Sequence, residues 1–294
     1  MEFYANLHLH STHSDGVYTP KELVKIAKEE GYSAIAITDH DTASAYPELQ
    51  DACAEHGLEC VFGVEFTVQK PRDYHIVAFN FDPEYPPMKK YLADMAYRQT
   101  DNTKKCFDEA VEKGSITGVT WEEVLEFNRG IPWLCNNHVF NLLKAKGLEK
   151  EENYMNWFDK NYRHQRAKYP PVLSFLPLNE LVALIKAAGG FAVVAHPVSG
   201  ALAYIDELIA SGVEGVEVWH ADMNKDEREL AYKLALEKGL FISGGSDHSG
   251  LLGGFYSSYP DEESLKKSHL YIEPHSVGTT KEYFDEIKNG KISR

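Results

Sequence analysis

The 294-residue sequence has few cysteines, no long hydrophobic run and no excess of basic residues. Its four cysteines have neither the paired spacing of a zinc finger nor the density of a disulfide scaffold. No apolar run approaches the ~20 residues needed to span a bilayer. The N-terminus also lacks the basic and apolar regions of a signal peptide. These absences argue against membrane-spanning and disulfide-stabilised classes, and we expect a cytoplasmic protein.

Positive charge is also scarce. The 45 acidic residues outnumber the 30 basic ones, which gives a net charge of −15 at pH 7. An acidic surface repels the phosphate backbone on which nucleic-acid affinity depends. The charge therefore argues against long nucleic acid as a partner and favours a small substrate. If that substrate carries a phosphate, bound metal ions would supply the local positive charge.

Strand-like and helix-like segments alternate at both ends of the chain. The expected strands span residues 3–10, 32–41, 59–68, 73–81, 191–197, 213–220, 240–248 and 268–274. The expected helices between them span residues 19–31, 42–57, 178–190, 201–212, 224–239 and 280–289. Such alternation predicts an α/β fold with a parallel sheet. The count is about seven βα units, which are enough to close a barrel.

The alternation stops between residues 85 and 175, where the sequence reads as helical throughout. Thr120 and Glu123 form a capping-box pattern inside this region. We therefore expect three parts: residues 1–84 and 176–294 as the two parts of a barrel, and 85–175 as an inserted helical subdomain that covers the active site.

Histidines and carboxylates gather where the expected strands end. They are His8, His10, Asp39, His40, Asp41, Glu65, His75, His196, His220, Asp247 and His248. Barrel enzymes carry their active sites at the carboxyl ends of their strands. This pattern predicts a functional site assembled from several strands.

The spacing and chemistry of these side chains predict metal binding. His8 and His10 lie two residues apart on a strand and so point to the same side. Imidazole and carboxylate ligands without thiolate suit Zn, Mn or Fe. Roughly nine donors, at three or four per ion, predict two or three divalent ions. A carboxylate such as Glu65 could bridge two of them.

Other residues have more than one interpretation. A lone histidine is more often structural, and His56, His164, His269 and His275 are left outside the site. His13 is expected to lie beside the ligands or to face the substrate. Asp39 and Asp41 are expected to orient His40 or to transfer protons. Glu217 and His220 remain open between a structural role and a role in the site.

Several motifs together resemble the PHP (polymerase and histidinol phosphatase) metal-dependent phosphoesterases. They are "HLHSTHSDG", "AITDHDT", "GVEF", the strand histidine at 75, "AAGGFAVVAHP" and "GGSDHSG". The helical region with "NNHVFNLLKAKG" is similar to the branch acting on nucleotides and short RNA. The resemblance implies a distorted seven-stranded (βα) barrel of PHP type holding two or three ions, commonly Mn, Fe or Zn.

The resemblance also implies a division of the ligands. His8 and His10 would bind one ion with Glu65 and Asp247, and Asp15 and His40 would hold a second. Glu65 would bridge to a third ion that His75 and His196 complete.

The sequence departs from the family pattern in two places. Ser249 stands where the family has the histidine of Asp-x-His. Either the adjacent His248 is the ligand or the second ion is held more loosely, and of the two we expect His248. Asn136 stands where relatives carry an arginine, two residues before His138, and an amide cannot reproduce a bidentate phosphate clamp. Asn136, His138 and Arg129 are the substrate-binding candidates, with Arg163 and Arg166 as other possible replacements for the arginine.

The predicted activity is hydrolysis of a small phosphate ester by attack of a metal-bridging hydroxide on phosphorus. A nucleotide with a mono-, bis- or cyclic phosphate is the expected substrate. The alternatives are a histidinol-phosphate phosphatase, a 5′–3′ exonuclease on short RNA and a non-catalytic metal-binding module. A barrel-type carbon–nitrogen hydrolase is a weaker alternative, because the expected bridging lysine is missing.

Overall fold

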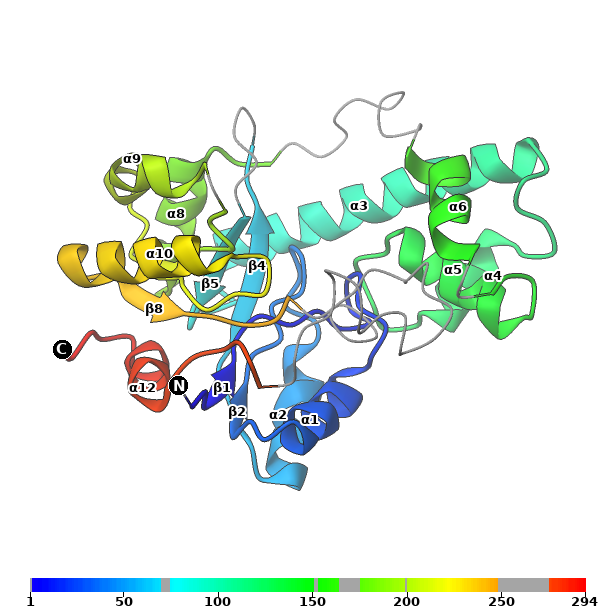
Figure 1. The fold of residues 1–294 in the computed structure, drawn as a ribbon. Helices are drawn as coiled ribbons and strands as arrows, with labels where there is room; N and C mark the ends of the chain where they lie inside the picture. The colour runs from blue at the N-terminus through cyan, green and yellow to red at the C-terminus, as the bar shows by residue number, and fades with distance from the viewer. Residues whose placement is uncertain (1, 70–74, 151–152, 164–174, 199, 248–274) are drawn as a thin grey trace.

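A computed structural model describes residues 2–69, 75–150, 153–163, 175–198, 200–247 and 275–294 (Figure 1). Within these ranges the chain forms a mixed α/β fold with one three-stranded and one five-stranded sheet. No described helix is both long and apolar enough to cross a membrane.

The three-stranded sheet is parallel and contains β1 (Ala5–Asn6), β2 (Ala34–Ile35) and β3 (Glu59–Cys60). Helices α1 (Pro20–Glu29) and α2 (Tyr46–His56) connect these strands and pack together on this sheet. The predicted start of α1 is confirmed, because Thr19 and Glu22 form a capping box before Pro20. Helix α2 begins four residues later than predicted, at Tyr46 rather than at Thr42. Thr42 instead bonds Ser44 through its side chain, which favours a turn there.

The five-stranded sheet has the order β4 (Gly63–Thr67), β5 (His75–Phe79), β6 (Phe191–Val194), β7 (Gly215–Glu217) and β8 (Phe241–Ser243). The prediction of a wholly parallel sheet is wrong at one strand. Strand β5 runs antiparallel to both β4 and β6. Only a short connection separates β4 from β5, and a parallel pair requires a crossover of a dozen or more residues.

Besides the start of α3 (Pro86–Glu112), which places Met88 in the same core, four described helices pack against the five-stranded sheet. They are α8 (Leu178–Ala187), α9 (Ile205–Ala210), which follows the short 3₁₀ helix η3 (Leu202–Tyr204), α10 (Lys225–Lys238) and α12 (Lys281–Asn289). Apolar side chains of α8, α9 and α10 share one core cluster with β4 to β8, and Phe284 and Ile287 of α12 pack in a second. The strand expected at 268–274 lies outside the described residues.

A group of helices lies between β5 and β6. It comprises α3 (Pro86–Glu112), α4 (Trp121–Phe127), α5 (Asn136–Ala145), α6 (Tyr154–Phe158) and the π-helical turn η2 (Asp159–Arg163). The capping box of Thr120 and Glu123 is confirmed at the start of α4. These helices bury their own apolar cluster, which includes Phe107, Val124 and Phe140. Figure 1 shows α3 running from the five-stranded sheet out to α4, α5 and α6.

Among the described residues no continuous ladder joins the two sheets, so a closed seven-stranded barrel is not shown. Single backbone contacts link them instead. The amide of Leu7 donates to the carbonyl of Gly244 at 3.2 Å, and the amide of Asp247 donates to the carbonyl of His8 at 2.9 Å. Gly245 permits this approach, since a Cβ there would lie 2.4 Å from the backbone nitrogen of His8.

Replacing Gly245 by alanine should therefore separate the end of β8 from the end of β1. We expect Gly245→Ala to destabilise the protein by about 1–3 kcal/mol, which is typical of overpacking. Urea unfolding measures this loss. Gly200→Ala is the matched control, because a Cβ at Gly200 would meet nothing within 4 Å. Equal stability of the two variants would contradict the close approach.

Candidate metal centre

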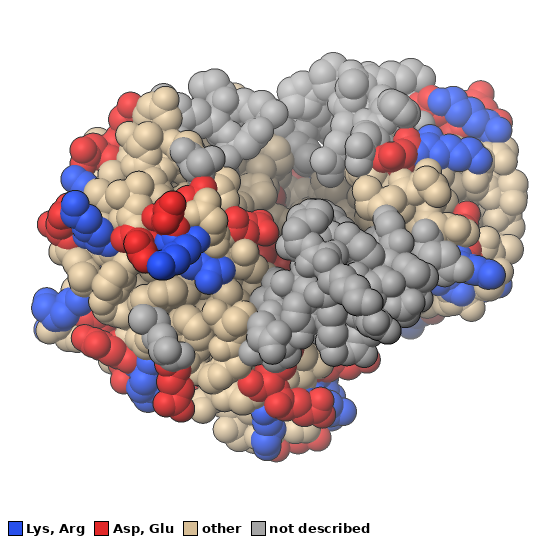
Figure 2. All heavy atoms as spheres, in the orientation of Figure 1, with Lys and Arg blue, Asp and Glu red and all other residues tan. Residues whose placement is uncertain are grey.

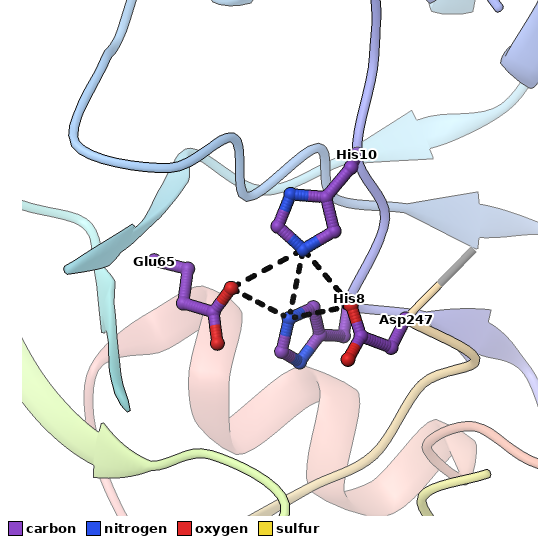
Figure 3. A group of neighbouring side chains, drawn as sticks. All are labelled: His8, His10, Glu65 and Asp247. Carbon is purple, nitrogen blue, oxygen red and sulfur yellow. Dashed lines mark hydrogen bonds and ion pairs between the residues drawn. The ribbon is translucent and has the colours of Figure 1, made fainter. Parts of the chain in front are cut away.

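Four predicted ligands converge from three parts of the fold. His8 and His10 follow β1, Glu65 lies in β4 and Asp247 follows β8. His8, His10 and Glu65 are almost completely buried, and the Asp247 side chain is 27% exposed. Figure 3 shows the four side chains pointing toward one another. The i, i+2 spacing of the histidines on an extended backbone places both rings on one side.

The distances among their donor atoms fit a metal ion. The two Nε2 atoms of His8 and His10 lie 3.3 Å apart, and Glu65 Oε2 lies 3.3 and 3.2 Å from them. Asp247 Oδ1 lies 3.6 and 3.0 Å from the same two nitrogens. Ligands ~2.1 Å from an ion are about 3.4 Å apart in a tetrahedral site and about 3.0 Å apart in an octahedral one.

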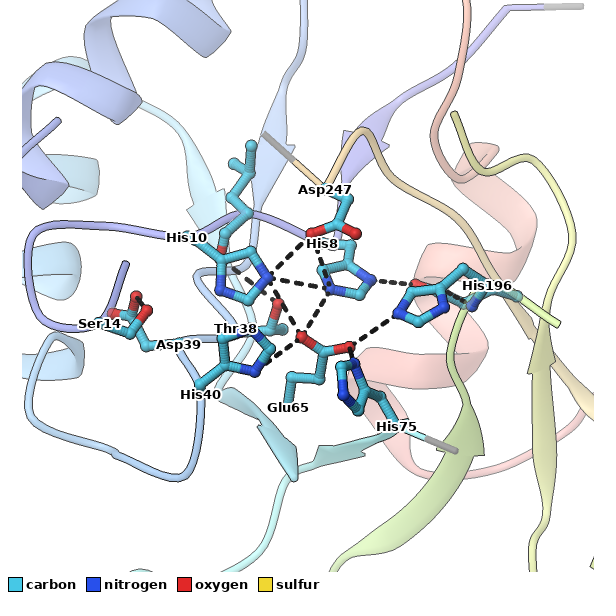
Figure 4. A network of polar contacts seen from close by, with 12 residues as sticks. His8, His10, Ser14, Thr38, Asp39, His40, Glu65, His75, His196 and Asp247 are labelled. Atoms are coloured by element: carbon cyan, nitrogen blue, oxygen red, sulfur yellow. Dashed lines mark hydrogen bonds and ion pairs between the residues drawn. The ribbon is translucent and has the colours of Figure 1, made fainter. Parts of the chain in front are cut away.

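A second group surrounds the same glutamate. Glu65 Oε1 lies 2.9 Å from His75 Nδ1 and 3.0 Å from His196 Nε2, while Oε2 lies 3.2 Å from His40 Nδ1 (Figure 4). His75 lies beside the ends of the neighbouring strands because β5 is antiparallel. His75 pairs with Thr67, the last residue of β4. The first residue of β5 thus takes the place that the last residue of a parallel strand would occupy.

Asp15 completes a third group with two histidines already named. Its carboxylate oxygens lie 3.5 Å from His10 Nδ1 and 3.8 Å from His40 Nε2. A neutral imidazole has a single lone pair, so each of these rings binds an ion through one nitrogen only. His10, His40 and Glu65 each belong to two of the three groups, but each of these histidines can serve as ligand to only one of the ions.

Unpaired buried atoms support occupation by metal. Among the described residues, the buried Nδ1 atoms of His10 and His40 and Oε2 of Glu65 have no hydrogen-bond partner. Such atoms carry a desolvation penalty unless an ion or another group satisfies them. His40 Nδ1 lies 3.2 Å from Glu65 Oε2, and His10 Nδ1 lies 3.5 Å from Asp15 Oδ1, and neither contact has hydrogen-bond geometry. Lone pairs directed at shared points are what a divalent ion requires, so these residues fit a metal.

Electrostatics show how the site compensates itself without metal. Burial alone would lower the pKa of His8, but Glu217, Glu65 and Asp247 outweigh burial and raise it well above its usual value. The pKa of His10 is raised in the same way against burial, by Asp247, Glu65 and Asp15. Burial alone would raise the pKa of Glu65, but the surrounding histidines outweigh burial and lower this pKa well below its usual range. The carboxylates thus favour positive charge at His8 and His10, which is the charge that a bound cation would also supply.

Backbone strain is concentrated at the same place. Asp41, His196 and Asp247 have φ angles of 51°, 27° and 53°, in the left-handed region that non-glycine residues rarely adopt. All three follow strand segments that lead into the site. Strain of this kind persists where surrounding contacts hold it, and it is common at functional sites.

The aspartate predicted to orient His40 instead holds the loop after His10. Asp39 is 1% exposed and accepts from the backbone N–H and hydroxyl of Ser11, at 2.7 and 2.6 Å, and from the hydroxyl of Ser14. These bonds fix the loop that carries Asp15. Asp39 thus supports a predicted ligand through the backbone, and its oxygens are occupied by loop donors.

Asp41 and His13 also contact groups beside the predicted ligands. Asp41 accepts from the backbone and hydroxyl of Thr67 at 3.2 and 3.1 Å, and burial raises its pKa to about 7 despite these bonds. His13 Nδ1 lies 2.8 Å from Ser44 Oγ. Neither residue belongs to the groups with metal-ligand spacing among the described residues.

Glu217 and His220, which the sequence leaves open, both lie at the site. Glu217 is fully buried; its carboxylate lies 2.8 Å from His8 Nδ1 and accepts the backbone N–H of His196 at 2.6 Å. A carboxylate on Nδ1 leaves the Nε2 lone pair of His8 free for metal. His220 is buried beside them, with Nε2 3.8 Å from both Glu217 and Asp247. Their position at the end of β7 was the available sequence signal.

The predicted substrate-binding residues make contacts within the protein. His138 uses both ring nitrogens, accepting from the Cys135 amide at 2.9 Å and donating to the Thr12 carbonyl at 3.0 Å. Asn136 Nδ2 lies 2.6 Å from Tyr154 Oη. Arg129 is 77% exposed and pairs with Glu126 at 2.5 Å. A role for these three in substrate binding stays a prediction. His248, Arg166 and the Arg163 side chain lie outside the described residues.

Comparison of the sequence with known proteins identifies its family. The family model described as the PHP domain matches residues 6–135. The 5'-3' exoribonuclease Rnm of Salmonella typhimurium is 31% identical over 251 residues, which cover 82% of this chain and 84% of that protein. This chain belongs to the PHP family. The resemblance seen in the motifs is thereby confirmed.

Two further relatives extend the PHP assignment along the chain. A phosphoribosyl 1,2-cyclic phosphate 1,2-diphosphodiesterase from Eggerthella lenta is 26% identical, over 84% of this chain and 95% of that protein. A crystal structure from Bifidobacterium adolescentis, provisionally named a metal-dependent phosphoesterase, matches with a TM-score of 0.74 at 25% identity. The match covers 99% of this chain and 97% of the Bifidobacterium adolescentis chain. This PHP protein is accordingly a metal-dependent phosphoric ester hydrolase.

Metal should stabilise this PHP protein more strongly as pH rises. Burial alone would lower the pKa of His196, but Glu65 raises it to about 9 in the folded metal-free chain. Because the folded pKa exceeds the unfolded value of about 6.5, this protonation stabilises fully below pH 6.5 and is lost as pH rises through about 9. We expect the increase in Tm on adding Mn²⁺ to grow by roughly 5 °C between pH 6.5 and pH 9. A constant or shrinking increase would contradict the compensation described above.

Glu217 should affect metal affinity without binding metal itself. In Glu217→Gln, an amide NH₂ would face either the Nδ1–H of His8 or the backbone N–H of His196, which are both donors. Losing such a partner typically weakens metal binding 10–100-fold. Competition with a chelator for Mn²⁺ measures this change. Glu214→Gln is the matched control, because Glu214 is 43% exposed and pairs with Lys186; equal losses in both variants would argue against the proposed role.

Proposed function

We propose that this protein hydrolyses a small phosphate ester of the nucleotide class, using the metal centre built around Glu65. The observation that carries this proposal is the set of donor distances from 3.0 to 3.6 Å among His8, His10, Glu65 and Asp247. The phosphoesterase relatives give the reaction class. The predicted ligands are His8, His10, Asp15, His40, Glu65, His75, His196, Asp247 and His248.

Each group of residues has a distinct task in this reaction. The residues around Glu65 would hold divalent ions, which would supply an activated water and positive charge for phosphoryl oxygens when bound. Glu65 holds neighbouring ligand groups at a fixed separation because its two oxygens face different histidines. Glu217 orients His8 and His196, and Asp39 orients the loop of Asp15. Burial of His8, Glu65 and Glu217 keeps competing water from this part of the centre.

Two or three ions, of Mn, Fe or Zn, match this ligand set. Imidazole and carboxylate donors without thiolate suit these metals. Charge gives a second argument: Asp15, Glu65, Asp247 and Glu217 place four carboxylates beside the histidines. Two divalent ions would balance them, and a third would leave positive charge for a phosphate.

The finer architecture is part of the proposal. A distorted seven-stranded barrel is supported by the Leu7–Gly244 backbone bond between β1 and the end of β8, and by the parallel bridge between His40 and Glu65. The helices from α3 to η2 would form the inserted subdomain. Trp133, just before α5, supports its place beside the site, because its ring stacks 6.5 Å from that of His40.

Surface charge favours a small substrate. Figure 2 shows lysine and arginine scattered among acidic side chains, with no continuous basic surface over the described part of this face. A protein that binds long nucleic acid needs such a surface to neutralise phosphates. A 5′–3′ exonuclease on short RNA remains the second candidate, because the Salmonella relative carries that name.

The first experiment measures phosphate release by Mn-reconstituted protein over a substrate panel. The panel contains nucleoside monophosphates, 3′,5′-bisphosphates, a cyclic phosphodiester, a short 5′-phosphorylated RNA and histidinol phosphate. We expect a strong preference for one nucleotide. His196→Ala should lower kcat at least about 100-fold, because it removes a ligand from the Glu65 group.

A matched histidine variant controls for general damage. His56 is the last residue of α2 and lies outside the predicted ligand groups, with its ring 3.9 Å from the exposed carboxylate of Glu55, so His56→Ala should retain full activity. Equal activity of His196→Ala and wild type would indicate a contaminating phosphatase. A metal-loaded protein that releases no phosphate from any substrate would favour the non-catalytic alternative.

A further inference from the structure

We infer that the segment Cys135–His138, at the start of α5, positions Asp15 and thereby sets the affinity of the ion held beside His10 and His40. This inference rests on the metal centre proposed above. It assigns a task in that centre to helices that contribute none of the predicted ligands. The residues concerned are positioning residues, since they reach the ligand only through its backbone.

Three side chains of this segment each take a different carbonyl of the loop after His10. His138 Nε2 donates to the carbonyl of Thr12 at 3.0 Å, and Cys135 Sγ donates to that of Ser14 at 3.5 Å. Asn137 Nδ2 donates to the carbonyl of Asp15 itself. Three of the four carbonyls between Thr12 and Asp15 are therefore held from one short segment.

The donors are fixed before they reach the loop. The Nδ1 atom of His138 accepts the backbone N–H of Cys135 at 2.9 Å, so the proton of the neutral ring lies on Nε2 and faces Thr12. The side-chain oxygen of Asn137 accepts from Tyr154 and from Asn136, which turns its NH₂ toward Asp15. Because these orientations are set within the helices, the loop meets a preorganised partner.

Asp15 needs this support more than the other predicted ligands do. Its side chain is 36% exposed, whereas those of His10 and Glu65 are 1% exposed. Asp39 holds Ser11 and Ser14 from the β2 side, and the α5 segment holds the carbonyls from the opposite side. If the contacts from the α5 segment are lost, ion binding must order the loop. The conformational entropy lost in that ordering weakens the binding of the ion.

The test compares Mn²⁺ binding by His138→Ala, Asn137→Ala and His138→Gln with that of wild type. Metal content is measured by elemental analysis after dialysis, and affinity by competition with a chelator. We expect the two alanine variants to lose about one equivalent of Mn²⁺, or to bind their weakest ion about 10-fold less tightly. His138→Gln should restore most of the affinity, because its amide N–H can still donate to Thr12.

A variant inside the same helices separates this effect from simple destabilisation. Ser115 donates to Asn161 Oδ1 at 2.6 Å, so Ser115→Ala weakens the helical group without touching the loop. It should keep the wild-type Mn²⁺ content, while Asp15→Asn should reproduce the loss seen in the alanine variants. If His138→Ala does not fold, the Mn²⁺ content and affinity of Asn137→Ala test the inference, since that variant removes the contact to Asp15 directly.

The outcomes distinguish this inference from the proposed function. Wild type that binds no Mn²⁺ would overturn the metal centre itself. Wild type that binds Mn²⁺, with the same content and affinity in Asn137→Ala and His138→Ala, would overturn only the role of the α5 segment. An equal loss in Ser115→Ala would also overturn it, because fold stability would then explain the change.

Discussion

The buried carboxylate of Glu65 is the group around which the rest of the centre is arranged. Its two oxygens contact five imidazoles from four different parts of the chain, at 2.9 to 3.3 Å. Its backbone is fixed as well, donating to the Thr38 carbonyl at 3.0 Å and accepting the Asp41 amide at 2.9 Å. An ionised carboxylate with 1% exposure is unstable unless positive charge surrounds it. That requirement links segments from both sheets, in addition to their short ladders.

The sequence predicted the part of this arrangement that depends on strand periodicity. His8 and His10 share a face because alternate residues of an extended chain do, and Glu65 and Asp247 follow buried apolar segments that could only be strands. The helix starts at Thr19 and Thr120 were predictable too, because a capping box is a local interaction between residues three apart.

Features that depend on contacts between distant segments could not be predicted in this way. The reversal of β5 arises from a short connection, and alternation of apolar residues does not distinguish the two strand directions. The sequence places Glu217 at a strand end but leaves its role open, because that role depends on His8, which lies 209 positions away and 2.8 Å from the Glu217 carboxylate. The contacts of Asn137 and His138 join residues more than 120 positions apart, and no periodicity encodes such pairs.

The position of the α3 to η2 helices in the sheet also bears on how such enzymes diversify. These helices lie in the chain between β5 and β6, two strands that pair directly, with Phe79 opposite Phe191. Residues 80–190 therefore begin and end at neighbouring positions of the sheet, as in the loop of an enlarged hairpin, so the length of this segment can change without altering the sheet. Exchange of the whole segment between relatives is topologically simple. Chemically it is constrained, because a transplanted segment must also bring donors for the carbonyls of the loop that ends at Asp15.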